Sequence, residues 1–361
     1  MLVKAVDTIV DLVKEGSGNI MVFGIGGGGD IVSAAVLASA LERYGFKSFI
    51  GSIVWERFLV DPVPGPVGLE ELVGIDIIGD YSGVIMDEVH VLRGGRRITP
   101  QVYLVSKATG KPVYIVDIKY GVKGYVKGLQ ELMDYLGIDF FIAIDVGGDV
   151  LAEGWEEELW SPLADSLGLA AFNYFKNSML AVHGIGGDGE LPPNRILERI
   201  ALLCKLGGCL GARGLTHRDA VFLEKILSIA LSEASLIPLL AFRGYYGYYP
   251  IRAGTREVLV TPVQSITFFL DLHKAYDISP LARIVDKTSS IEEARDKLNK
   301  ACIYTELDLE YDLQPYIDNI DKPGIIIKTR LEGMKRIKPV SYTHLRAHET
   351  SLHLVCRLLL E

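Results

Sequence analysis

A glycine cluster near the N-terminus constrains the fold of this chain more than any other feature. Residues 20–23 form an apolar run that is typical of a buried strand, and residues 24–30 follow it as Gly-Ile-Gly-Gly-Gly-Gly-Asp. Residues 30–44 have an apolar side with helical spacing, and residues 48–55 predict a second strand. Strand, glycine loop, helix and strand together form a βαβ unit, which requires its two strands to pair in parallel.

The rest of the chain continues the alternation of strands and helices. Residues 113–116, 140–144 and 179–182 are apolar runs that predict further buried strands. Helical faces are predicted in residues 2–13, 126–133, 196–203, 217–235, 265–276 and 290–301. Since no internal repeat or linker divides the sequence, we expect one large α/β domain, residues 1–338, built on a doubly wound, mostly parallel, Rossmann-like sheet.

Residues 304–313 alternate between apolar and acidic side chains, which predicts a half-exposed strand near a sheet edge. We expect the acidic members to form a solvated face, because charged side chains protect a sheet edge from pairing with another strand. These acidic members are Glu306, Asp308, Glu310 and Asp312.

Charge and hydropathy exclude several classes of protein. The 361 residues include 37 basic and 46 acidic side chains, for a net charge of -9, whereas a general binder of nucleic acid or anionic membrane needs a basic face. No apolar run approaches the roughly 18 residues of a membrane span, and the first residues lack the apolar core of a signal peptide. We therefore expect a cytoplasmic protein that binds a small-molecule ligand and binds neither nucleic acid nor membranes. The sequence leaves open whether the protein forms a homo-oligomer.

The last residues of the sequence resemble a non-native tail. Residues 340–350 match the translation of a transposase-type sequencing adapter codon by codon in a single frame, and residues 353–361 match the far end of that adapter. The alternative is a native amphipathic tail over residues 352–360. We expect residues 339–361 to be adapter read-through, which would put the end of the natural chain near Lys338.

The glycine cluster satisfies the pattern G-x-G-x-x-G at Gly24, Gly26 and Gly29. In that pattern the glycines permit a tight turn and a close approach of the backbone to a ligand, and the following helix presents free N–H groups to an anion. The candidate cofactor-binding residues are Gly24, Gly26, Gly27, Gly28, Gly29, Asp30 and Glu56.

Two features of this loop depart from a standard dinucleotide site. Asp30 places a carboxylate where a pyrophosphate would lie, and like charges repel each other. Glu56 lies 32 residues beyond Gly24, whereas the acid that contacts the ribose is usually about 20 residues beyond the motif. The alternative interpretation makes Asp30 a helix N-cap and the glycines a packing device.

Two further loops combine glycines with acidic residues directly after predicted strands. Residues 145–149 read Asp-Val-Gly-Gly-Asp, and residues 183–190 read His-Gly-Ile-Gly-Gly-Asp-Gly-Glu. Because loops that follow parallel strands open on one edge of a sheet, we expect all three glycine loops to converge there. The candidate catalytic residues are Asp145, Asp149, Asp188 and Glu190. Three roles are open for these carboxylates: they bind Mg²⁺, they orient substrate hydroxyls or an ammonium group, or one of them acts as a general base with a raised pKa. The sequence does not choose among these roles.

Several basic side chains are secondary candidates. His183 is either an acid–base group or a core histidine with its hydrogen bonds satisfied. Five arginines either pair with a carboxylate or phosphate of a substrate or serve as surface and structural residues. These arginines are Arg57, Arg213, Arg218, Arg252 and Arg256.

The combination of these segments resembles domain-of-unknown-function family 1152, which is found largely in archaea. The likeness covers roughly residues 15–330 and is carried by residues 26–30, 55–66, 145–149, 161–163 and 187–190. The resemblance supports the fold unit, and it implies no reaction because the family has no established one.

Two functions are compatible with the sequence. The first is an enzyme that acts on a nucleotide-like or phosphorylated small metabolite, with a nucleotide or Mg²⁺ as candidate cofactor; the second is a non-catalytic sensor on the same scaffold. Carboxylates that converge within about 8 Å, with at least one buried, favour the enzyme, because perturbed acids in a cleft mark chemistry.

Overall fold

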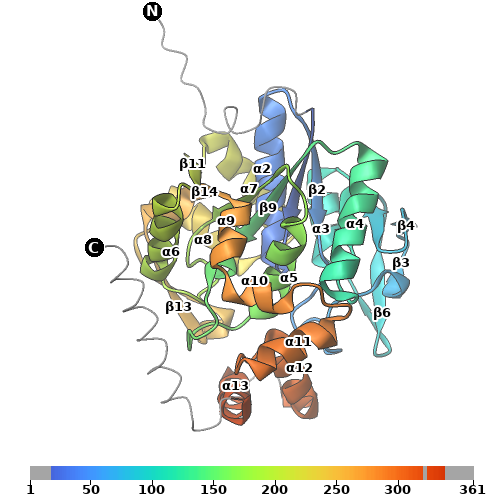
Figure 1. Ribbon diagram of the computed structural model, residues 1–361, viewed down its shortest axis with the longest axis vertical. Coiled ribbons are helices and arrows are strands. Elements are labelled where there is room, and N and C mark those ends of the chain that lie inside the picture. Colours follow the sequence, from blue (N-terminus) through green and yellow to red (C-terminus); the bar gives the residue numbers. More distant parts are fainter. Residues whose placement is uncertain (1–17, 320–322, 338–361) are drawn as a thin grey trace, which may run out of the picture.

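The computed structural model describes residues 18–319 and 323–337 of the chain (Figure 1). The helix predicted over residues 2–13 and the adapter-like segment 339–361 lie outside these ranges. Within the ranges, the chain is a mixed α/β protein with helices on both faces of a large central sheet.

The central sheet has nine strands in the order β11-β14-β10-β9-β1-β2-β8-β5-β4. Its five middle strands, from β10 to β8, run parallel, and antiparallel strands extend the sheet at both edges. The strands of this sheet are β1 (Asn19–Gly24), β2 (Lys47–Ser52), β4 (Asp76–Ile77), β5 (Ser82–Ile85), β8 (Val113–Val116), β9 (Phe140–Val146), β10 (Ser178–His183), β11 (Cys209–Gly214) and β14 (Ile266–Asp271). The chain progresses outward from β1 through β2 to β8 and then returns to β9 on the other side of β1, so the order of connections reverses between β1 and β9.

Short strands form two additional sheets. The three-stranded one contains β3 (Leu72–Val73), β6 (His90–Arg93) and β7 (Arg96–Ile98), and the two-stranded one contains β12 (Gly247–Ile251) and β13 (Arg256–Val260). The helices are α2 (Gly28–Arg43), α3 (Gln101–Thr109), α4 (Gly121–Leu136), α5 (Pro162–Phe172), α6 (Pro193–Lys205), α7 (His217–Leu227), α8 (Glu233–Phe242), α9 (Leu272–Ile278), α10 (Pro280–Val285), α11 (Ile291–Lys300), α12 (Glu306–Leu313) and α13 (Pro323–Ile337). No helix in residues 18–319 or 323–337 is long and apolar enough to cross a membrane.

The alternation of side chains along β1 builds a separate core on each face of the sheet. Met21 and Phe23 belong to a core shared with α4, α5, α6 and α9–α11. Ile20 and Val22 belong to the opposite core, which α2, α3 and α7 cover. Because successive side chains of a strand point to opposite faces, a central strand that is apolar throughout is buried on both sides.

Two of the predicted helices differ in the structure. The helix predicted over 217–235 is divided into α7 and α8, and Ser232 starts α8 by accepting a hydrogen bond from the N–H of Ser235. The helix predicted over 265–276 is wrong in its first half, because residues 266–271 form β14, which pairs antiparallel with β10 and β11. The run Ile-Thr-Phe-Phe-Leu is rich in residues that favour strands, and that preference prevails over the helical spacing.

The strand predicted over residues 304–313 is also wrong, because this segment forms helix α12. Thr305 caps the helix by accepting from the N–H of Asp308, whose carboxylate accepts in return from the N–H and hydroxyl of Thr305. This reciprocal capping box favours the start of a helix, even though the residues that follow it alternate between apolar and acidic side chains. The acidic residues do not form a solvated face, since Asp308 and Glu310 are buried.

Candidate functional site

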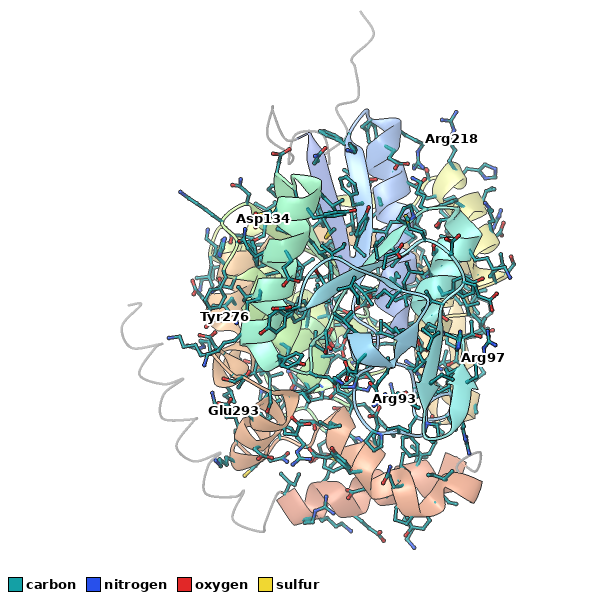
Figure 2. The ribbon with its side chains drawn as sticks, turned by 90° about the vertical axis from the view of Figure 1, so that its right-hand side faces the viewer. Arg93, Arg97, Asp134, Arg218, Tyr276 and Glu293 are labelled. Atoms are coloured by element: carbon teal, nitrogen blue, oxygen red, sulfur yellow. The ribbon has the colours of Figure 1, made fainter. Side chains whose placement is uncertain are left out.

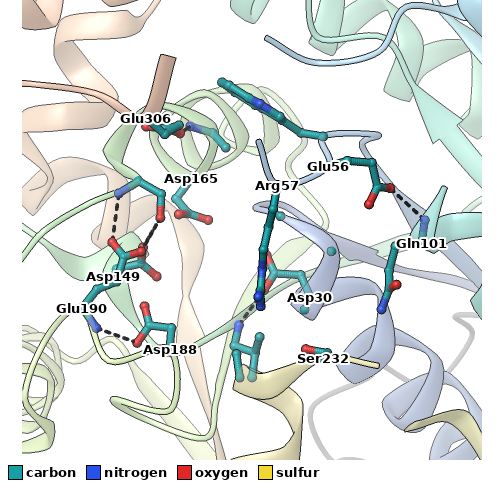
Figure 3. A pocket seen from close by; sticks show the side chains of 18 of the residues that line it. Asp30, Glu56, Arg57, Gln101, Asp149, Asp165, Asp188, Glu190, Ser232 and Glu306 are labelled. Atoms are coloured by element: carbon teal, nitrogen blue, oxygen red, sulfur yellow. Dashed lines mark hydrogen bonds between the residues drawn. The ribbon is translucent and has the colours of Figure 1, made fainter. Parts of the chain in front are cut away.

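A cavity of about 450 Å³ lies at the carboxyl ends of the central strands, beside the reversal between β1 and β9 (Figure 3). The loops after β1, β2, β9 and β10 line it, together with the first turns of α5, α8 and α12. The three glycine loops therefore converge at one edge, as the sequence predicted. The carboxylates of the lining are Asp30, Glu56, Asp145, Asp149, Asp165, Asp188, Glu190, Glu306 and Glu310.

The glycine loop after β1 contains glycines of two kinds. A Cβ atom on Gly24 would lie 2.8 Å from backbone atoms of α2, one on Gly26 would lie 2.4 Å from Oδ1 of Asp165, and one on Gly29 would lie 2.9 Å from a methyl of Val146. These three positions of the motif are therefore required by the protein's own packing. A Cβ atom on Gly27 would meet no described heavy atom within 4 Å, and the residue has an ordinary φ of -75°.

Asp30 binds the backbone of its own loop. Its carboxylate accepts hydrogen bonds from the N–H of Gly26 at 2.5 Å and from the N–H of Val146 at 2.8 Å, which ties the loop to the end of β9. Gly27, and not Asp30, occupies the N-cap position of α2. Burial raises the pKa of Asp30 to about 7, although the two hydrogen bonds act in the opposite direction.

Six carboxylates form two compact groups. Within each group the oxygen atoms that can bind a ligand lie within 4.8 Å of one another, and all six side chains are buried. The first trio consists of Asp30, Asp145 and Asp165, and the second trio consists of Asp149, Asp188 and Glu190. Figure 3 shows the second trio gathered on one side of the cavity, with Asp165 nearby and Glu56 on the opposite side. All four predicted catalytic residues thus meet in one cavity.

Each trio contains one fully buried carboxylate oxygen without a partner among the described residues. Oδ1 of Asp165 and Oδ2 of Asp188 are buried and form no hydrogen bond with the described residues. Both side chains are 5 % exposed. A buried carboxylate oxygen that lacks a partner is costly, because it has lost its hydration without replacement. The two atoms are therefore the oxygens of the cavity best suited to accept from a donor or to bind a cation.

Glu190 is the most firmly held member of the second trio. One of its oxygens accepts from the N–H groups of Trp160 and Ser161, and the other accepts from the Ser161 hydroxyl at 2.6 Å. Arg256 forms an ion pair with it at 3.3 Å. The guanidinium groups of Arg256 and Arg330 both stack on the ring of Trp160, at 4.2 and 4.4 Å from its centroid. Helix α13 thus supports the loop that positions Glu190.

Burial and mutual repulsion perturb the acids of the cavity. Burial first, and neighbouring carboxylates second, raise the pKa of Asp145, Asp149 and Asp165 well above the ordinary carboxyl value. The same two causes raise the pKa of Asp188 to about 7. Acids with such raised values bind protons near neutral pH unless a cation compensates their charge.

The sequence reasoning missed three acids of this cavity. Asp165 lies in the first turn of α5. It follows Ser161 and Pro162 in the sequence, and these two residues are typical of a helix start. Glu306 accepts from the N–H groups of Leu163 and Ala164 and thereby caps the same helix. Burial raises the pKa of Glu306 to about 8.

Glu310 lies one turn beyond Glu306 on α12. It accepts from the indole N–H of Trp55 at 3.0 Å and from the N–H of Gly65 at 2.7 Å. Burial raises its pKa to about 8. A capping signal at Thr305 would have found the pair, because it places acids four positions apart on one helical face.

Glu56 lines the cavity on the side opposite the second trio (Figure 3). Its carboxylate accepts from the N–H of Gln101 at 2.7 Å and so caps α3, and burial raises its pKa to about 7. Arg57 and Arg252 also line the cavity, where both face Glu233, at 2.8 and 3.6 Å.

The remaining candidates lie away from the cavity. Arg213 is paired with Asp219, and Arg218 points outward from the surface (Figure 2). His183 is buried and shares a hydrogen bond of 2.8 Å with the Thr267 hydroxyl. Burial lowers its pKa to about 4, so it stays neutral as a core histidine.

The fold and the site define a class: a mixed α/β protein with an acidic cavity at the carboxyl ends of parallel strands. Within that class, the chain belongs to the family described as protein of unknown function (DUF1152), whose model matches residues 21–314. The matched range includes both trios and α12 and ends before α13. Neither the search of curated proteins nor the search of solved structures returned a match.

Proposed function

We propose that this protein is an enzyme that binds a phosphorylated or nucleotide-like small metabolite together with a divalent cation. The observation that carries the proposal is the pair of buried, unpartnered oxygens, Oδ1 of Asp165 and Oδ2 of Asp188, in a cavity whose lining is rich in carboxylates. Carboxylate oxygens are the ligands that Mg²⁺ and Mn²⁺ prefer.

The arrangement of the strands supports a nucleotide-like ligand. We take the five parallel strands, in the order β10-β9-β1-β2-β8, to be a Rossmann-like sheet, in which ligands bind outside the carboxyl ends at the reversal of strand order. Gly27 leaves open space in front of the N-terminus of α2, where an anionic group would be stabilised by the helix dipole. The free cysteines Cys204, Cys209 and Cys302 fit our proposal of a cytoplasmic setting.

The acidity of the cavity explains why a cation belongs to the proposal. A phosphate group alone would be repelled by the carboxylates of both trios, whereas a divalent cation between them would compensate the charge and bind phosphate oxygens directly. A carboxylate with a raised pKa next to that cation is suited to take a proton from a nucleophile. A non-catalytic sensor has less need of buried acids within 4.8 Å of one another, so this geometry favours the enzyme.

A thermal-shift screen of the full chain tests the proposal. Nucleotides and phosphosugars are each added with Mg²⁺ or Mn²⁺ and with a chelator, since a ligand that binds the folded state raises the melting temperature. We expect a shift that needs both ligand and cation and that Asp188→Asn abolishes. Asp134→Asn is the matched control, because Asp134 is exposed on α4 (Figure 2). No shift with any phosphorylated compound would contradict the proposal, and a shifting compound that is never converted would identify the sensor.

A further inference from the structure

We propose that the cavity holds two divalent cations side by side, one bound by each trio. The inference rests on the proposed function in one respect, the presence of a cation, and it adds the number of cations and the ligands of each. The carboxylates enclose two separate places for an ion, each defined by three buried side chains.

The geometry matches one ion per trio. Oxygen ligands lie about 2.0–2.6 Å from Mg²⁺ or Ca²⁺, so two oxygens on opposite sides of one ion are about 4–5 Å apart. The ligand oxygens of each trio lie within 4.8 Å of one another, and the two groups have no member in common. Each trio also has its own unpartnered oxygen, from Asp165 in the first and Asp188 in the second. A single ion at one trio would leave the other oxygen buried without a partner.

The first trio is prepared by the backbone. Asp30 is held by two N–H groups, and Asp145 accepts from the N–H of Val150 at 3.2 Å. A carboxylate oxygen with one hydrogen bond keeps a lone pair for a metal ion. Asp165 approaches from α5, so the three ligands come from α2, β9 and α5, and their positions do not depend on a single loop.

In the second trio the oxygens left for an ion belong to Asp149 and Asp188. Both oxygens of Glu190 already accept two donors each, so Glu190 contributes mainly its negative charge. Oδ1 of Asp188 accepts from the N–H of Glu190, which leaves Oδ2 for an ion. Among the described residues, the side chain of Asp149 makes a long contact of 3.5 Å with the Ser161 hydroxyl and no shorter hydrogen bond, so its carboxylate is available as well.

Charge also favours two ions. The six carboxylates of the trios have one ion-pair partner among the described residues, Arg256, which faces Glu190. One divalent cation would still leave three or more uncompensated carboxylates in a buried site, and such charges are costly. Two divalent cations together with Arg256 would leave only one of the six carboxylates without a compensating positive charge. All the ligands are hard oxygen atoms, so the expected ions are Mg²⁺ or Mn²⁺, and their open positions would receive oxygens of a phosphorylated substrate.

Titration calorimetry of the chelator-treated full chain with Mn²⁺ tests the inference. We expect two Mn²⁺ per chain for the parent, one for Asp165→Asn, one for Asp188→Asn and none for the double variant. Asp134→Asn should keep two. Since a variant can fail for lack of folding, electron paramagnetic resonance of the parent is the second measurement. Two adjacent Mn²⁺ ions give the exchange-coupled signal of a pair, whereas one ion gives an isolated six-line signal.

The outcomes separate this inference from the proposed function. One Mn²⁺ per chain, with an isolated signal, overturns the two-cation site while a cation-dependent enzyme stands. Two Mn²⁺ with a coupled signal support it even if no phosphorylated compound binds in the thermal-shift screen, in which case only the proposed substrate falls. No bound Mn²⁺ overturns both.

Discussion

Gly24→Ala and Gly27→Ala each add one methyl group to the same loop, yet the structure predicts opposite results. The Cβ atom of the first variant would lie 2.8 Å from the backbone C of Asp30 and the backbone N of Ile31. The Cβ atom of the second would point into open space, with no described heavy atom within 4 Å. One methyl group therefore tests the fold and the other tests the ligand site.

The magnitudes follow from what each methyl group displaces. In Gly24→Ala the start of α2 has to shift, and overpacking of this kind costs about 1–3 kcal/mol. In Gly27→Ala the backbone is compatible with alanine, which restricts the unfolded chain and stabilises by about 0.4–1 kcal/mol. Alanine is a poorer N-cap than glycine, so the two effects oppose each other and the net change should be below about 1 kcal/mol. Its methyl group occupies the ligand space, and we expect affinity for a phosphorylated ligand to fall at least about tenfold, or about 1.4 kcal/mol.

Urea denaturation of the parent and both variants measures the first effect, and ligand titration of the folded Gly27→Ala protein measures the second. Gly214→Ala is the matched control, because Gly214 also faces open space but ends β11 outside the cavity lining. If Gly27→Ala is destabilised as much as Gly24→Ala, the assignment of a packing role to one and a ligand role to the other is refuted. Equal ligand affinity in Gly27→Ala and Gly214→Ala would refute the ligand role alone.

The buried acids and the Trp160 stack lead to three other predictions. Burial raises the pKa of Glu56 to about 7 and of Glu310 to about 8, so above about pH 4.5 these two groups bind more protons in the folded chain than in the unfolded chain. In the presence of a chelator, the melting temperature should therefore fall as the pH rises from 6 to 9. A melting temperature that rises over this range would contradict the raised pKa values. Glu306→Gln leaves one acceptor oxygen for the N–H groups at the start of α5 and should cost about 1–3 kcal/mol in urea denaturation; an unchanged midpoint would show that this cap is dispensable. Arg330→Lys loses the planar stack on Trp160 and the Nη2 group that donates to the carbonyls of Glu157 and Leu159, and it should lower stability by about 1–3 kcal/mol in the same assay. Parent-like unfolding would argue against a supporting role of α13.

Segment 304–313 shows where reading a pattern has its limit. In a strictly alternating segment, side chains of one kind recur at every second position. Residues four positions apart are therefore also of one kind, and in a helix such residues lie on the same face. The capping pair Thr305 and Asp308 resolves the ambiguity in favour of α12, and α12 then places Glu306 and Glu310 in the cavity. A single error of secondary structure therefore removed two cavity acids from the predicted site.

The sequence by itself determined the βαβ unit, the parallel middle of the sheet and the edge where the glycine loops meet. Those features depend on local chemistry, because apolar runs are buried as strands and glycines permit the turns that follow them. For the same reason Asp145, Asp149, Asp188 and Glu190 were recognisable, because they belong to two glycine-rich segments that follow predicted strands.

The tertiary structure alone decided the grouping of the acids. Asp165 comes from α5, and it meets Asp30 and Asp145 only because the sheet brings β1 beside β9 and packs α5 against it. The antiparallel addition of β14 was likewise decided by pairing with distant strands. Contacts between residues far apart in the chain depend on packing that no local pattern encodes, so the existence of an acidic edge was predictable and its division into two trios was not.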